Sequence, residues 1–482
     1  MTMTAGDRGA ASTQDVRIEH DLLGDVEIPA SAYWGAHSQR ATAGIAAGAG
    51  PLGAYARLTD AVVLVKKAAA AANAELGVVA PQIGDAIAQA CDELLAGELR
   101  DQLIVDVLAP SDTSYNMNVN EVLANRASEI LGSPLGTYAP VHPLDHVNRS
   151  QSTNDVIHTA LHIVAVGLVE AVDAALAQLE DSFERKAAEH ADVVRMGRTC
   201  LQDALPITFG QVWGGYASAV RASRLALARE LEPLAVVNLG ATAVGTGFNA
   251  PSGYRALALA RLSEYSGRSW REPESLVGAT QNDEPMAFLM GRARVVGLSL
   301  SKIATDLKLM GSGPVAGFNE IRLPAVQSGS SIMPGKVNPV VPMLVNQTAY
   351  LVAGYDDAVS FAVSDGELEL NAHGSMIVYC LLEAFGLLER AARTLAAACV
   401  DGIEVNAETC AQMTARSPVL ATALLPVTGY DAASKVAYAA LEQCRPVADV
   451  VADMGLLDRK AAHTLLDPTN FLAPASDRTN HE

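Results

Sequence analysis

A series of long segments with helical apolar spacing is the feature that most constrains how this 482-residue chain can fold. Five such segments occupy the middle of the chain, at residues 153–191, 207–233, 283–311, 338–364 and 372–400. The run VIHTALHIVAVGLVEAVDAALAQL in the first is apolar on more than one face. A helix of this kind must be buried on several sides. We therefore predict a mainly all-α fold whose long helices form a bundle shared between subunits of an obligate oligomer; a large monomeric bundle is the alternative.

The composition excludes several classes of function. The net charge of −20 argues against a nucleic-acid or membrane-surface partner, because a polyanion would be repelled. It leaves room for a small anionic substrate, since local basic groups can outweigh the global field. The six cysteines are scattered without a C-x-x-C pair, which indicates neither a disulfide framework nor a zinc site and favours a reduced, cytoplasmic protein. No uninterrupted apolar run reaches about 18 residues, so no membrane-spanning helix is expected.

The chain divides at changes of composition. The polar stretch at 1–16 has no apolar core of a signal peptide, and we expect a disordered tail there. The stretch 134–150 contains three prolines and indicates a long connection. The segments after the bundle are short. We therefore predict an N-terminal, mostly helical domain at 17–150, the bundle domain at 151–404 and a small helical domain at 405–482.

Four polar clusters interrupt the apolar background: DTSYNMNVNE (112–121), NRSQSTND (148–155), GRTCLQDALP (197–206) and SGSSIMPGKVNP (328–339). They offer hydroxyls, carboxamides and backbone N–H groups, with a single lysine among them. None gathers the His and carboxylate ligands that metals require. Neutral donors of this kind suit the binding of carboxylates. Helix capping is the alternative for any one cluster, but four in one chain favour a site.

The cluster at 328–339 has glycines and a lysine, as a phosphate-binding loop does, but its spacing differs. Five residues separate Gly329 from Gly335, and Val337 follows Lys336 where a magnesium-binding Ser or Thr is required. No buried strand precedes the loop. These three observations argue against a nucleotide site.

The segment GSSIMPGKVNP resembles the signature of the fumarase/aspartase superfamily. The segments TSYNMNVNEVLANRA, HPLDHVNRSQSTND and GRTCLQDALPITFGQ resemble further regions of that family, in the same order. NLGATAVGTGFNAP and DLKLMGSGPVAGFNEIRLP are most like the aspartate ammonia-lyase branch. The resemblance runs from about Arg17 to about Ala473. It implies three mostly helical domains, a central bundle of five long helices, and a homotetramer with a shared helical core whose active sites each draw on three subunits.

The resemblance also implies a reaction, the anti elimination from a 2-substituted succinate that yields fumarate through an aci-carboxylate intermediate. Ser330 would be the general base, with Lys336 beside it in the loop. Hydroxyl and amide groups would bind the two carboxylates of the substrate. The implied substrate-binding residues are Thr113, Ser114, Ser152, Thr153, Asn154, Thr199, Cys200, Ser331 and Asn338, with Lys336 contributing as well. No organic cofactor and no metal site are implied, and whether a divalent ion activates the enzyme is left open.

Three positions depart from the family pattern. Cys200 stands where most relatives have His after Gly-Arg-Thr, and it is interpreted either as a small buried packing residue or as the mark of a changed leaving group. His158 stands where Pro is usual, and it is either a satisfied helix residue or a replacement imidazole. His373 lies close to residue 375, where Pro is expected.

Aspartate is the substrate expected from overall likeness. Because the leaving-group side has changed, nitrosuccinate, which would release nitrite, or another nitrogen-substituted succinate is the alternative. Water as the leaving group, as in fumarase, is expected less. A non-catalytic structural relative is a further possibility, against which the intact Ser330, Lys336 and Asn338 argue.

Overall fold

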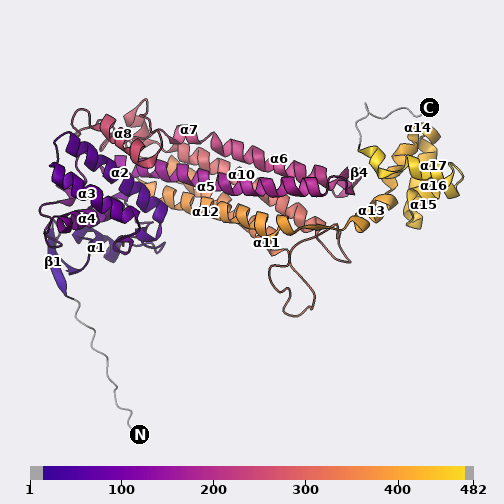
Figure 1. Cartoon of the computed structure of the whole chain (residues 1–482), viewed down its shortest axis with the longest axis horizontal. Helices are drawn as coiled ribbons and strands as arrows, with labels where there is room; N and C mark the ends of the chain where they lie inside the picture. The colour runs from indigo at the N-terminus through magenta and orange to yellow at the C-terminus, as the bar shows by residue number, and fades with distance from the viewer. Residues whose placement is uncertain (1–14, 473–482) are drawn as a thin grey trace, which may run out of the picture. The chain divides into compact units, whose positions relative to one another are not determined.

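The computed structural model describes residues 15–472 (Figure 1). The tail predicted at 1–16 lies outside this range except for its last two residues. Within the described part, the chain forms two compact units. The first contains the chain up to Glu170 together with Arg229–Arg292 and Gly354–Phe385, and the second contains Ala171–Ala228, Ala293–Ala353 and the chain from Gly386. The division into three domains stays a prediction.

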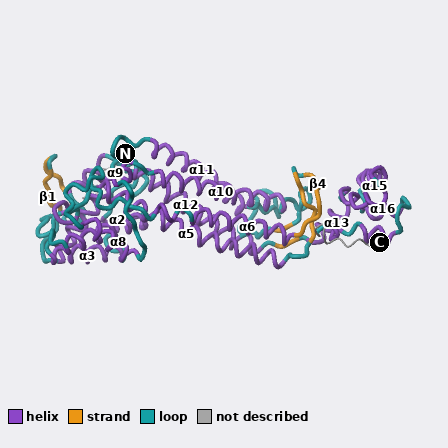
Figure 2. The backbone as a smooth tube through the Cα atoms, turned by 90° about the horizontal axis from the view of Figure 1, so that it is seen from above, coloured by secondary structure: helices purple, strands orange, loops and turns teal. Residues whose placement is uncertain are grey.

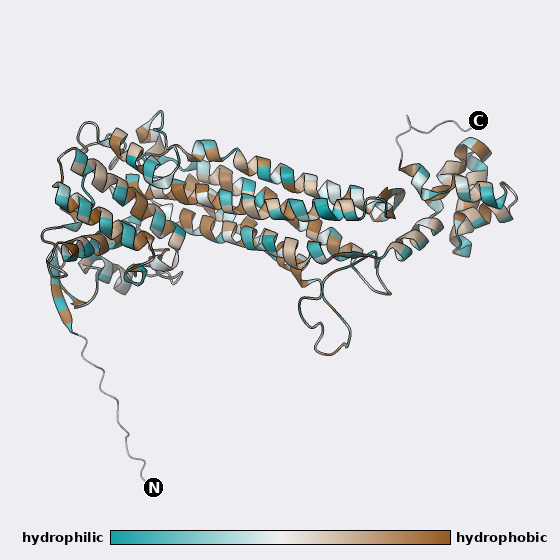
Figure 3. Cartoon of the chain, viewed as in Figure 1, coloured by the Kyte–Doolittle hydropathy of each residue, from teal (hydrophilic) through white to brown (hydrophobic). Residues whose placement is uncertain are grey.

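The mainly helical fold is confirmed, and the long helices fall where the sequence predicts them (Figures 1 and 2). They are α5 (Thr153–Glu189), α6 (Phe209–Ala228), α10 (Glu284–Met310), α11 (Val340–Ser364) and α12 (Gly374–Ala398). Apolar residues recur along them (Figure 3). In α5 the buried positions include Val164, Leu168, Val172, Leu176 and Leu179. Among the described residues, α5 alone is long and apolar enough to cross a membrane, but 61% of that stretch is buried inside the protein, as in a core helix.

Shorter helices complete the two units. The first unit contains α1 (Ala36–Gly44), α2 (Ala56–Glu75), α3 (Pro81–Leu95), α4 (Asp112–Ile130), α7 (Leu231–Leu234), α8 (Tyr254–Ser266) and α9 (Leu276–Gln281). The chain ends in α13 (Ala407–Arg416), α14 (Leu425–Thr428), α15 (Tyr430–Gln443), α16 (Val447–Asp453) and α17 (Arg459–Leu465). Leu424, Val436, Val447 and Val451 are buried together in this last segment, which therefore has a hydrophobic core of its own.

Three antiparallel strand pairs, orange in Figure 2, accompany the helices in the described residues. They are β1 (Val16–Asp21) with β2 (Gly24–Pro29), β3 (Val194–Thr199) with β4 (Gln202–Thr208), and β5 (Ile321–Arg322) with β6 (Glu404–Val405). The sequence analysis predicts none of them. The β3–β4 pair has Thr199 opposite Gln202, so Cys200 and Leu201 form its two-residue turn.

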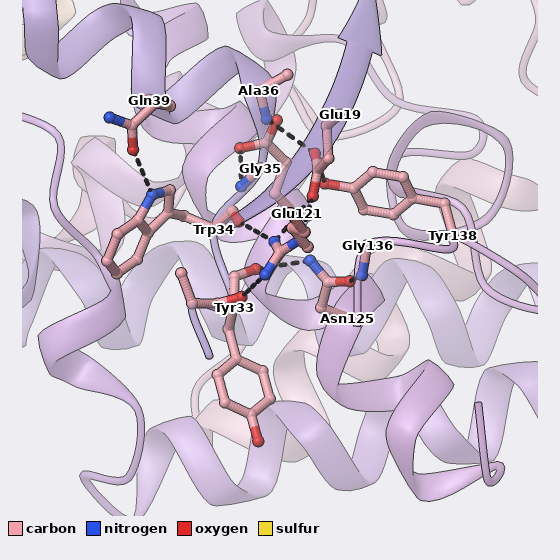
Figure 4. Close-up of polar contacts among 12 residues, drawn as sticks. Glu19, Tyr33, Trp34, Gly35, Ala36, Gln39, Glu121, Asn125, Gly136 and Tyr138 are labelled. Carbon is pink, nitrogen blue, oxygen red and sulfur yellow. Dashed lines mark hydrogen bonds and ion pairs between the residues drawn. The ribbon is translucent and has the colours of Figure 1, made fainter. Parts of the chain in front are cut away.

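Buried carboxylates hold the N-terminal segment against α4 (Figure 4). Glu121 of α4 accepts hydrogen bonds from the backbone N–H groups of Gly35 (2.9 Å), His37 (2.9 Å) and Ser38 (3.2 Å), and from the Ser38 hydroxyl (2.6 Å). These N–H groups lie at the start of α1, where no helical partner exists for them and where a negative charge is favourable. Glu19 of β1 accepts from the N–H of Ala36 (3.0 Å) in the same way. The contacts fix α1 and β1 to the helix that carries Thr113 and Ser114.

His158 of α5 is buried and paired with Asp283, the residue before α10. The imidazole Nδ1 lies 3.0 Å from Asp283 Oδ1, and the two side chains are 3% and 1% exposed. This geometry supports the interpretation of His158 as a helix residue that is paired at Nδ1, but its buried Nε2 has no hydrogen-bond partner among the described residues. Burial by itself lowers the pKa of His158, but Asp283, Asp112 and the backbone of Asn371 together raise it to about 9. The imidazolium therefore joins α5 to the residue that precedes α10 at neutral pH.

The raised pKa of His158 makes stability depend on pH. Because the folded-state pKa of about 9 exceeds the value of about 6.5 expected in the unfolded chain, the ion pair stabilises the protein fully below about pH 6.5. Its contribution, at most about 3 kcal/mol, is lost as the pH rises through 9. We expect the difference in melting temperature between the wild type and a His158→Gln variant to be largest near pH 6 and to shrink by pH 10.

The exposed His20 provides a matched control, since its pairing with Asp25 is on the surface. His20→Gln should change the melting temperature little at any pH. If the difference in melting temperature between the wild type and His158→Gln is the same at pH 6 and pH 10, the pair is not charged as proposed.

Candidate active site

The first turn of α4 presents the first two predicted site residues. Thr113 is exposed, whereas Ser114 is buried and its N–H donates to the carbonyl of Ser111. Burial raises the pKa of the neighbouring Asp112 to about 6, and one oxygen of this carboxylate accepts from the N–H of Ser375 (2.9 Å) at the start of α12. The turn that carries Thr113 is therefore tied to a second helix of the first unit.

The start of α5 presents Ser152, Thr153 and Asn154, all half-buried. Ser152 caps the helix, because its hydroxyl accepts from the N–H of Asn154 (3.3 Å) and its own N–H donates to Asp155 (2.8 Å). Helix capping, the alternative for the polar clusters, thus holds for this residue. Asn154 Nδ2 donates to the carbonyl of Ala243 (2.7 Å). The capping arrangement fixes the direction in which the three side chains leave the helix.

Asn116 joins these two groups of residues. Its Nδ2 donates to Asn148 Oδ1 (3.0 Å) and to the hydroxyl oxygen of Thr153 (3.2 Å). The start of α4 and the start of α5 are therefore held together by a buried amide. The structure thus brings the Thr113–Ser114 turn and the Ser152–Asn154 turn to one place in the first unit.

Thr199 and Cys200 lie at the exposed tip of the β3–β4 hairpin in the second unit. Cys200 and Leu201 have φ values of 53° and 61°, as the two-residue turn of a hairpin requires. The interpretation of Cys200 as a buried packing residue is wrong, because the turn places its thiol in solvent. Thr199 also lines a groove of about 1020 Å³ together with Arg198, Tyr216 and Lys302.

Ser330, Ser331, Lys336 and Asn338 lie in a long loop between Arg322 and Val340, which contains no helix or strand and extends away from the helices in Figure 1. The Ser330 hydroxyl is half-buried and accepts from the N–H groups of Ile332 (3.2 Å) and Met333 (3.1 Å). Ser331 and Lys336 are exposed, and Asn338 is half-buried. The loop thus turns back on itself around the Ser330 oxygen.

The base of this loop is closed by a backbone contact. A Cβ atom at Gly329 would lie 1.2 Å from the carbonyl oxygen of Lys336, so only glycine fits there. Gly335 has a φ of +82°, which also favours glycine. Residues 330–335 therefore form a closed turn that carries the predicted base.

Glu320 connects the hairpin to the start of this loop. Its fully buried carboxylate accepts from Arg195 Nη2 (2.7 Å) and Arg198 Nη1 (2.8 Å), both on β3. Two charge-assisted bonds to one buried carboxylate make a strong link. The two groups of predicted site residues in the second unit are thus anchored to one side chain. The residues predicted from α4 and α5 belong to the first unit.

Several residues that organise the site escape the sequence analysis. Asn116 and Asn148 lie inside the polar clusters but are not singled out there. Asp155 is recognisable in retrospect, because Ser152 and Asp155 have the spacing of a capping box. Glu320 has a weaker signal, a single acid between Asn319 and Ile321 in FNEIRL.

Comparisons with known proteins place this arrangement in a family. A family described as lyases matches residues 24–354, and the family described as the fumarase C C-terminus matches residues 420–473. The aspartate ammonia-lyase of Pseudomonas aeruginosa is 42% identical over 95% of this chain and 97% of its own length. The class II fumarate hydratase of Thermosynechococcus vestitus is 41% identical over 92% of this chain and 95% of its own.

A solved structure is similar as well. The fumarate lyase:delta crystallin of Brucella melitensis bound to cobalt has a TM-score of 0.93 and 44% identity, covering 95% of this chain and all of that one. The family matches, the identities and the shared fold together show that the chain belongs to the fumarase/aspartase superfamily and is an enzyme of the carbon–nitrogen lyase type.

Proposed function

We propose that the protein catalyses the anti elimination of a nitrogen group from a 2-substituted succinate to give fumarate, with Ser330 as the general base. The observation that carries this proposal is the position of the Ser330 hydroxyl, which accepts two backbone N–H groups in a turn closed by glycine. The base removes the proton beside a carboxylate, and the resulting carbanion becomes an aci-carboxylate with two negative charges on that group.

A serine hydroxyl is a weak base at neutral pH and must be activated. Two N–H groups at 3.2 and 3.1 Å stabilise a negative charge on the Ser330 oxygen. The ammonium group of Lys336, whose backbone touches Gly329 at the base of the same turn, adds a positive charge to the loop. Closure of this exposed loop over the substrate would exclude water during proton removal.

The other predicted residues provide neutral donors for the two carboxylates. Thr113, Ser114, Ser152, Thr153 and Ser331 suit the carboxylate that becomes the aci-form, and Thr199, Lys336 and Asn338 suit the other. Cys200 would lie near the leaving group, and Asn154 is a further substrate-binding residue. Because these residues are divided between two units of the chain, we propose that they meet between the protomers of a homotetramer, in sites that each draw on three subunits. No organic cofactor is required, since the electron sink is the substrate carboxylate. We place the enzyme in the cytoplasm.

The leaving group is ammonia in our first proposal, and the substrate is aspartate. Ammonia comes first because relatives named aspartate ammonia-lyase are 42% identical to this chain over nearly its whole length. The specific observation that favours a different nitrogen group is Cys200, whose thiol is exposed at the hairpin tip in place of the family imidazole. Nitrosuccinate, which would release nitrite, is therefore the second candidate.

Replacing Ser330 with alanine tests the base. We expect kcat to fall at least about a thousandfold, because the substrate proton has no acceptor, while the dissociation constant of succinate changes by less than about threefold. Stopped-flow absorbance of fumarate and calorimetry with succinate measure the two quantities. Ser328→Ala, in the same loop, should leave both unchanged. A kcat for Ser330→Ala close to that of the wild type would exclude Ser330 as the base.

A substrate screen tests the leaving group. Release of fumarate from aspartate, nitrosuccinate and malate is followed by ultraviolet absorbance for the wild type and for Cys200→His. We expect turnover of a nitrogen-substituted succinate by the wild type and a shift of kcat/KM toward aspartate in the variant, because an imidazole restores the family group at this position. Cys444→His, at the other exposed cysteine, is the control. An absence of fumarate release from all three compounds would reject the proposed reaction.

A further inference from the structure

Lys66 of α2 is a fully buried lysine in the first unit, and it is not among the predicted site residues. Its side chain is 0% exposed. Its ammonium Nζ donates to Asn148 Oδ1 (2.8 Å) and to Gln151 Oε1 (3.1 Å). Burying a charged lysine costs free energy unless the ammonium group is paired or hydrogen-bonded. Both of its partners lie in the segment that leads into Ser152 and Thr153.

Asn73 lies two helical turns after Lys66, on the same face of α2. Its Nδ2 donates to the carbonyl of Arg149 (2.8 Å), and its Oδ1 accepts from the hydroxyl of Ser150 (2.7 Å). Ser150 has a φ of 62° and needs such support. One face of α2 therefore holds the whole segment 148–151, which places the start of α5.

A chain of hydrogen bonds runs from Lys66 to the hydroxyl of Thr153. Asn148 Oδ1 accepts from Lys66 and also from Asn116 Nδ2 (3.0 Å) and Asn120 Nδ2 (3.3 Å). Asn116 Nδ2 then donates to Thr153 Oγ1 (3.2 Å). Because the Thr153 oxygen accepts in this chain, its own O–H is free to donate to another acceptor. Such a donor suits the carboxylate of a substrate.

The charge of Lys66 is sensitive to pH near neutrality. Burial lowers its pKa to about 7, against the opposing effects of Asp155 on α5 and Cys91 on α3. Helix α4 contributes the neutral amides of Asn116 and Asn120. Helix α8 contributes Tyr254, whose hydroxyl is buried near Asp155. The positive charge behind the Thr153 hydroxyl is therefore lost as the pH rises through about 7.

We propose that Lys66 is a positioning residue that aims the Thr153 hydroxyl at the substrate and adds a positive charge behind the dicarboxylate site. The inference rests on the proposed function for the identity of the ligand, a succinate-like dianion. Lys66 acts through Asn148 and Asn116 and does not itself touch the ligand. The second carboxyl group of succinate is still partly protonated at the acid end of this range. Each dissociation constant is therefore referred to the concentration of the succinate dianion, so that the remaining change in affinity between pH 6 and pH 8 reports on the protein.

Calorimetric titration of the full-length protein with succinate between pH 5.5 and 9 tests the proposal. For the wild type we expect the dissociation constant to rise about tenfold between pH 6 and pH 8, as the lysine loses its proton. Lys66→Met should bind weakly at every pH and lack this transition. Asn148→Asp places a carboxylate beside the ammonium group, which raises the pKa of Lys66, and the transition should move above pH 8. A merely structural lysine would not produce that shift.

Lys67→Met is the matched control, since Lys67 is the next residue of α2 and pairs with Asp92 at the surface. It should bind succinate as the wild type does. Three results would overturn the proposal. The pH-dependent change in the dissociation constant could persist in Lys66→Met, or it could occur at the same pH in Asn148→Asp as in the wild type. The third result is that the wild type does not bind succinate. Fumarate release is measured on the same variants, so that failure of this proposal can be told apart from failure of the proposed function. If the variants and the wild type release fumarate but succinate affinity does not depend on Lys66, only the role proposed for Lys66 is rejected.

Discussion

The carboxylate of Asp155 is the contact on which the polar part of the first unit depends. It is fully buried, and it accepts from the N–H groups of Ser152 (2.8 Å), Gly240 (2.9 Å) and Thr242 (3.2 Å). Backbone groups in irregular segments have no helical partners, and leaving them unsatisfied inside a protein is costly. A single acid thus sets both the start of α5 and the loop that packs beside it.

The same solution recurs elsewhere in the chain. Glu121 satisfies the start of α1, and Glu320 holds two arginines of β3 at the entrance to the Ser330 loop. In each case a buried charge organises an irregular segment rather than a helix core. This division of labour explains how a chain dominated by apolar helices can present exposed hydroxyls such as Thr113 and Thr199 in defined places. The long helices supply rigidity, and the buried acids orient what emerges from their ends.

The sequence predicts the long helices well because their apolar positions repeat over many turns. The segment predicted at 207–233 corresponds to α6, but its first two residues belong to β4, and Pro233 lies in the separate helix α7. The β3–β4 hairpin is not predicted, since its turn residues Cys200 and Leu201 are not the Asn or Gly that usually mark such a turn. Lys66 is missed for a related reason, because one lysine inside an apolar helical run reads as a surface residue. Its role depends on partners about 80 positions later in the chain, which no local pattern contains.

The conformation of the loop that carries Ser330 depends on the glycine at position 329. A methyl group at residue 329 would act as a wedge between the two arms of the loop, because it would have to occupy the place of the Lys336 carbonyl oxygen. No reacting atom is altered by such a change, yet the arms would separate and the turn around Ser330 would open. Adding a single methyl group, as in Gly329→Ala, is thus enough to open the turn around Ser330. This glycine is therefore a suitable position at which to make an inactive protein whose helices are unchanged.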